Sequence, residues 1–133
     1  LAQTDAYLQH ARRCLEEANA LGERPSTATL NDLHRKFHRA LYARSENPIV
    51  IEALDRLQDI AALIVAEGWR ATTSWDVERH EHQLIIDALE RGQAEPAARL
   101  LHGHINAASA NWLAALARNR SRQAERDPSR WHE

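Results

Sequence analysis

Four histidines have the residue type and the spacing to bind one metal ion. His34 and His38 lie four residues apart, close to one turn of an α-helix, so their rings share a face. His82 and His104 lie in two later segments whose apolar residues have helical spacing. Neutral imidazole is the commonest side-chain metal ligand, and one ion can satisfy several buried imidazoles together. Two interpretations follow. Either the four histidines bind one metal ion, or each is hydrogen-bonded separately in the core.

Helical geometry separates the inward-facing histidines from the outward-facing ones. Residues two positions apart on a helix point about 200° apart, so only one of His80 and His82 can face the interior. His82 shares its face with apolar residues such as Ile85. The same test selects His104 over His102. We therefore expect His82 and His104 to point inward.

The chain has helical periodicity throughout, which predicts an all-α fold. The expected helices span residues 5–21, 28–44, 48–67, 75–91 and 94–118. Gly22, Gly68 and Gly92 follow three of them, where a glycine commonly ends a helix. Pro48 and Pro96 stand in first turns, where a missing N–H costs nothing. Short connections predict an antiparallel helical bundle over 1–118, followed by a polar C-terminal tail over 119–133.

Composition narrows the class of protein. The 133 residues suit one domain, and the net charge of -2 comes from 17 basic and 19 acidic residues spread evenly. Without a basic stripe, this segment is not expected to bind DNA directly, and no apolar run approaches the ~20 residues of a membrane span. The single cysteine, Cys14, fits the reducing cytoplasm. The chain starts at Leu1 and contains no methionine, so we expect a fragment of a longer protein.

Two sequence blocks resemble a known family. They are HRKFHRALYARSENPIV (34–50) and EHQLIIDALERGQAEPAARLLHGHI (81–105). His104 lies 22 positions after His82. Both are similar to the FCD domain, the effector-binding C-terminal half of FadR-type regulators in the GntR family. The resemblance covers about 1–118. It implies a cytoplasmic transcriptional regulator that forms a homodimer and binds DNA through an N-terminal winged-helix domain missing from this chain.

The resemblance also implies a metal site, with one departure from the family pattern. Metal-binding FCD domains use an aspartate and three histidines. The three histidines correspond here to His38, His82 and His104. The aspartate position is occupied by His34, which can still bind zinc, our first choice of divalent metal, or nickel, our second. Replacing the carboxylate raises the net charge of the centre by one unit. We hypothesise that the site then holds an anionic effector more strongly and the metal more weakly.

The expected effector is a small organic acid whose carboxylate reaches the metal. A carboxylate also favours bidentate donors, and two arginines are the candidates. Arg35 and Arg79 each lie three residues before a predicted ligand, His38 and His82 respectively. The alternative interpretation is that both arginines simply face solvent.

Two other functions compete with the sensor. A metal-dependent hydrolase or transferase of the DinB type would also use histidine ligands, but it needs a general base. Glu78 and Glu81 are the acidic residues near His82, and Glu81 lies about 100° away from the direction of that ligand on the helix. This arrangement gives little support for catalysis, and we do not expect an enzyme. The third alternative is a metal-free effector-binding or dimerisation domain.

Overall fold

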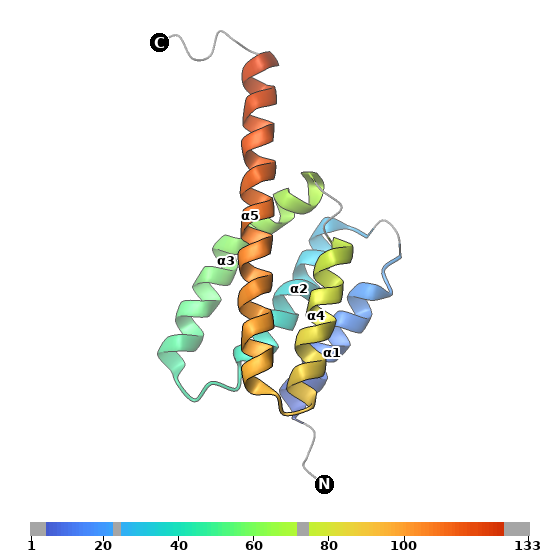
Figure 1. The fold of residues 1–133 in the computed structure, drawn as a ribbon, viewed down its shortest axis with the longest axis vertical. Helices are drawn as coiled ribbons and strands as arrows, with labels where there is room; N and C mark the ends of the chain where they lie inside the picture. The colour runs from blue at the N-terminus through green and yellow to red at the C-terminus, as the bar shows by residue number, and fades with distance from the viewer. Residues whose placement is uncertain (1–4, 23–24, 72–74, 127–133) are drawn as a thin grey trace.

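The fold is all-α, as the periodicity predicts. The structure is a computed structural model and describes residues 5–22, 25–71 and 75–126. These ranges contain no strand. Five helices follow one another, each antiparallel to the one before it (Figure 1). They are α1 (Ala6–Asn19), α2 (Thr27–Tyr42), α3 (Pro48–Ala71), α4 (Trp75–Glu90) and α5 (Ala94–Arg126). Within the same ranges, no helix is both long enough and apolar enough to cross a membrane.

Local signals in the sequence set several helix ends. The Asp5 side chain accepts a hydrogen bond from the backbone N–H of Tyr7 at 2.9 Å and caps α1. Asn47 caps α3 in the same way, accepting from the N–H of Ile49 at 3.0 Å. Gly22 and Gly92 have φ values of 81° and 71°, the left-handed conformation that glycine adopts after a helix. These boundaries lie within two residues of the predicted ones.

Helix packing creates two apolar clusters beside the histidines. α1 packs on α2 and α4, α4 packs on α5, and α3 lies against α2 and α5. The larger cluster joins α1, α2 and α4 through Leu8, Ala11, Cys14, Leu15, Phe37, Ala40 and Ile86. The smaller one contains Ala18, Leu30 and Leu33, with Trp69 and Trp75 packed against it. Cys14 is therefore a buried core residue.

The end predicted for the third helix is wrong. α3 continues through Gly68 to Ala71, so Trp69 belongs to the helix rather than to a polar connection. A Cβ atom on Gly68 would lie only 2.3 Å from Cδ1 of Trp112 on α5. The glycine therefore allows α3 and α5 to approach each other, which is a packing role and not a stop signal. Ser74 directly precedes the expected fourth helix and is a candidate N-cap from its residue type, but it lies outside the described residues.

The end predicted for the fifth helix is also wrong. α5 extends to Arg126 instead of stopping near residue 118, and its last turns project beyond the rest of the bundle (Figure 1). The segment 119–126, NRSRQAER, contains neither glycine nor proline and is rich in good helix formers. A polar composition alone is therefore not a signal for the end of a helix. Residues 127–133 of the predicted tail lie outside the described ranges, and the domain division at 118 stays a prediction.

Candidate metal centre

The four predicted histidines meet in the interior of the bundle. His34 and His38 come from α2, His82 from α4 and His104 from α5, and all four side chains are buried. The Nε2 atom of His38 lies 3.1 Å from that of His34 and 3.2 Å from that of His82. The Nε2 atoms of His82 and His104 are 3.1 Å apart. One nitrogen from each ring lies within 4.8 Å of the other three, so the group could hold a metal ion.

The positions of the other histidines follow the helical argument. His80 and His102 are exposed, whereas His82 and His104 are buried, as predicted. His82 lies beside Ile85 and Ile86, which are 1 % and 0 % exposed. One face of each helix is buried, so one histidine of each pair points to the interior.

The donor set fits a divalent transition ion. Four nitrogens bound to zinc at ~2.0–2.1 Å on a tetrahedron would lie about 3.3 Å apart, close to the observed neighbour distances. Two facing ring nitrogens can share only one proton, so a cluster of four is poorly satisfied by hydrogen bonds alone. Among the described residues, His82 Nδ1 is also buried without a hydrogen-bond partner. A cation among the Nε2 atoms would engage all four lone pairs.

Burial keeps the cluster in its ligand form. It lowers the pKa of His34 and of His82 well below the usual value, and the neighbouring histidines lower both further. Burial, followed by the charge of His104, lowers the pKa of His38 to about 3. These three rings are consequently neutral near pH 7. Neutral imidazole has the free lone pair that a metal requires.

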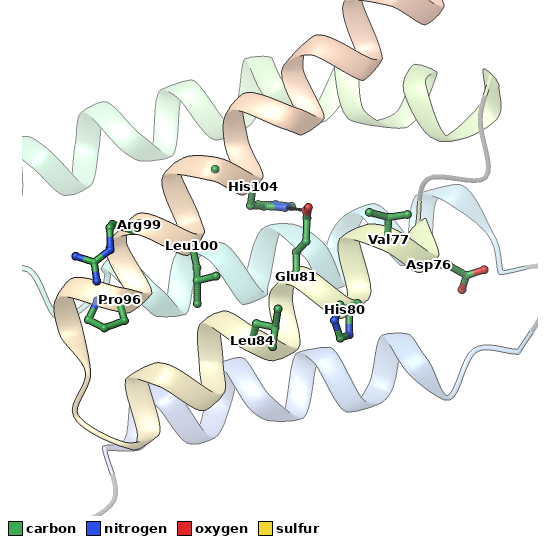
Figure 2. A pocket seen from close by; sticks show the side chains of 10 residues that line it. Asp76, Val77, His80, Glu81, Leu84, Pro96, Arg99, Leu100 and His104 are labelled. Carbon is green, nitrogen blue, oxygen red and sulfur yellow. Dashed lines mark hydrogen bonds and ion pairs between the residues drawn. The ribbon is translucent and has the colours of Figure 1, made fainter.

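Glu81 orients one of the four rings. Its Oε2 atom accepts a hydrogen bond from Nδ1 of His104 at 2.6 Å. Figure 2 shows this carboxylate reaching from α4 to the ring on α5, at the wall of a broad groove between the two helices. Because Nδ1 carries the proton, Nε2 of His104 offers its lone pair to the cluster. The sequence suggests Glu81 only as a candidate general base, although its place beside His82 on the facing helix is a signal for this contact.

Glu78 brings a carboxylate to the other side of the cluster. It is only 3 % exposed, and its Oε1 atom accepts a hydrogen bond from Nε1 of Trp69 at 3.0 Å. Its Oε2 atom lies 3.7 Å from Nε2 of His34. From the resemblance, we expected His34 to stand where metal-binding FCD domains have an aspartate. In the structure, a carboxylate from α4 lies beside His34.

A cavity reaches the cluster from one side. The α2–α3–α5 cavity has a volume of about 390 Å³, and His34, His38 and His104 form part of its wall. Arg35 also lines it, with its guanidinium bonded to the carboxylate of Asp59. Arg79 does not line this cavity and pairs with Asp76 at 3.2 Å. The structure thus brings Arg35, but not Arg79, to the space beside the four histidines.

Comparison with known proteins identifies the family. No curated protein and no solved structure matches the chain. Residues 1–107 match the FCD domain, and this span contains helices α1 to α4, the first part of α5 and all four clustered histidines. The chain therefore belongs to the FCD domain family.

Proposed function

We propose that this chain is the ligand-sensing domain of a GntR-type transcriptional regulator that binds a divalent metal and a small organic acid. FCD domains are regulatory effector-binding domains and not enzymes. The observation that carries the proposal is the convergence of four buried Nε2 atoms beside a cavity large enough for a small molecule, with three of the four histidines in its wall. The histidine cluster supplies a place for a metal, and the cavity supplies access for an effector.

The proposed ligands are His34, His38, His82 and His104. Zinc is the first choice and nickel the second, since imidazole suits both ions. The bound metal would supply Lewis acidity toward a carboxylate in an added coordination position. The chain's own contribution is to hold the rings, through Glu81 at His104, and to exclude water with the rings of Phe37 and Trp69 packed around the site.

Effector binding would act on DNA at a distance. In the proposed regulator the chain forms a homodimer in the cytoplasm, and DNA is bound by an N-terminal winged-helix domain. The effector shifts the equilibrium between two arrangements of those domains by binding one arrangement more tightly than the other. The α2–α3–α5 cavity is bounded by three helices, so filling it provides a physical route to such a shift.

The hydrolase alternative gains no support from the two nearby carboxylates. Glu81 is bonded to His104, and Glu78 is bonded through Oε1 to Trp69 while its Oε2 atom lies 3.7 Å from Nε2 of His34, so both carboxylates face groups of the protein itself. A general base needs a carboxylate directed at a metal-bound water.

Metal analysis tests the proposal with matched histidine variants. Reconstituted protein is expected to hold one equivalent of zinc or nickel, measured by elemental analysis after gel filtration. His82→Ala and His104→Ala remove a ligand and should lose the metal. His80→Ala and His102→Ala remove exposed histidines of the same two helices and should retain it. Wild-type protein without metal after reconstitution would support the metal-free effector domain instead.

A second measurement tests the effector. Acetate is expected to bind the metal-loaded protein and not the metal-free protein, as followed by titration calorimetry. Hydrolysis of esters or amides by the loaded protein would favour the enzyme.

A further inference from the structure

The α2–α3–α5 cavity has a wall that is mainly apolar. Its side chains come from three helices and include Leu41, Leu54, Leu57, Val65, Leu101 and Ile105. Three of the clustered histidines occupy the same wall. At about 390 Å³, the cavity lies near the lower end of the range for small-molecule sites, roughly 300–1,000 Å³. A bound molecule would therefore meet polar nitrogens at the cluster and hydrocarbon along most of its remaining surface.

Two polar side chains of the wall already have charged partners within the protein. The guanidinium of Arg35 is bonded to Asp59. The hydroxyl of Tyr42 donates to Asp55 at 2.6 Å, and burial together with that hydrogen bond raises the pKa of the phenol. A ligand that recruited either group would have to compete with a carboxylate already in place. Gln58 and Ser109 are the other hydrogen-bonding aliphatic side chains of the wall, so it offers few groups to a ligand with many hydroxyls.

The side chain of Trp112 also lines this wall. Its Nε1 atom is buried and has no hydrogen-bond partner among the described residues. The indole ring packs against Gly68, where even a methyl group would lie 2.3 Å from Cδ1, so the ring has little freedom to move. The ring therefore adds a fixed aromatic surface to the wall, and its buried N–H is not accessible to a hydroxyl-rich ligand.

We infer that the effector is a small monocarboxylic acid with an apolar body, and not a sugar acid or a di- or tricarboxylate. This inference rests on the proposed function, because the carboxylate is placed at the histidine-held metal. The apolar body then lies between α3 and α5 along the leucine and isoleucine side chains. A second carboxylate on that body would meet mainly hydrocarbon, with Gln58 and Ser109 as the remaining uncharged polar side chains of the wall, which is unfavourable.

Titration calorimetry of the metal-loaded protein tests the chemical class. The probes are acetate, butanoate, hexanoate and octanoate, together with gluconate and succinate. Each buried methylene should tighten binding about fourfold until the tail fills the cavity. Hexanoate should bind at least tenfold more tightly than gluconate, which has the same number of carbons and five hydroxyl groups. Gluconate or succinate binding as tightly as hexanoate overturns the inference and leaves the metal-dependent effector site standing.

Two leucines of α3 provide a matched pair of variants. Leu57 lines the cavity and Leu63 does not, and both are already largely exposed, at 59 % and 77 %. Leu57→Ser should weaken hexanoate binding roughly threefold or more and leave acetate binding unchanged. Leu63→Ser should alter neither. Equal effects of the two variants on hexanoate would place the tail elsewhere and overturn the inference. Absence of binding by every acid, acetate included, would overturn both the inference and the proposed function.

Discussion

The carboxylate of Glu81 and the imidazole of His104 form a 2.6 Å hydrogen bond that links α4 to α5 at the histidine cluster. The bond holds the proton on Nδ1, so Nε2 is available as a ligand. Groups of this kind, bound to a ligand rather than to the metal, typically contribute 10–100-fold to metal affinity. We expect Glu81→Ala to weaken zinc binding by about that factor, measured by competition with a chromophoric chelator.

The conservative variant separates orientation from simple loss of structure. Glu81→Gln keeps an oxygen that can accept from Nδ1 but removes the charge, so its zinc affinity should lie between those of wild type and Glu81→Ala. Glu95→Gln changes an exposed carboxylate on α5 that pairs with Arg99, and it should leave zinc affinity unchanged. Wild-type affinity in Glu81→Ala would contradict the orienting role.

The pair Glu78 and His34 makes a second prediction, about charge. Glu78 Oε2 lies 3.7 Å from His34 Nε2, so it can offset the positive charge of a metal bound by four neutral rings. Glu78→Gln should therefore weaken zinc binding, by roughly tenfold. The amide oxygen can still accept from Trp69, so the hydrogen bond to the indole is retained.

A double-mutant cycle tests whether Glu78 supplies the charge that position 34 lacks. His34→Asp places a carboxylate on α2, and in that background Glu78→Gln should weaken zinc binding less than it does in wild type. Additive effects would show that the two positions act independently. If His34→Asp changed neither metal nor acetate binding, the hypothesis about the charge at position 34 would also fail.

The inward positions of the four histidines could be predicted because helical spacing constrains them strongly. A spacing of four positions puts His34 and His38 on one face, and a spacing of two positions puts one ring of the pair His80 and His82 outside. These relationships lie within single helices, so no tertiary information is needed. The five helices were predictable for the same reason.

Contacts between helices were harder to predict. Gly68 has the usual signal of a helix end, but the bulky ring of Trp112 on another helix determines its role. Likewise, Glu78 and Glu81 gain their partners only when α4 packs against its neighbours. Sequence spacing does not report the register between two helices, so the groups that support the cluster were missed.

The buried histidines make the stability of the metal-free protein depend on pH. The pKa values of His34, His38 and His82 are lowered by folding, that of His38 to about 3, whereas an unfolded histidine titrates near 6.5. Below pH 6.5 the unfolded chain binds protons that the native protein does not. Stability is therefore fully present above pH 6.5 and is lost as pH falls from there toward 3, by about 1.4 kcal/mol per pH unit for each histidine.

Urea denaturation of the metal-free protein between pH 7.5 and 5 measures this dependence. His82→Leu removes one of the three rings. It should reduce the slope of the free energy of unfolding against pH by about 1.4 kcal/mol per pH unit, the contribution of one proton. Metal-loaded protein should lose stability more steeply with acid, because protons also compete with the metal for the rings. A free energy of unfolding that stays constant from pH 7.5 to 5 would mean that the rings are protonated in the native state.

The contact between Gly68 and Trp112 predicts opposite effects of one substitution at two helical glycines. Alanine is favoured over glycine within a helix by about 1 kcal/mol. At Gly103 of α5 an added Cβ meets nothing within 4 Å, so Gly103→Ala should stabilise the protein by about 0.5–1 kcal/mol.

At Gly68 the same Cβ would lie 2.3 Å from the indole, and relieving that overlap costs about 1–3 kcal/mol. Gly68→Ala should therefore lower the free energy of unfolding, by up to about 2 kcal/mol after the helical gain is subtracted. Urea denaturation at neutral pH compares the two variants directly. Stabilisation by Gly68→Ala equal to that by Gly103→Ala would show that Trp112 moves aside freely, and that α3 and α5 are not held together by this close contact.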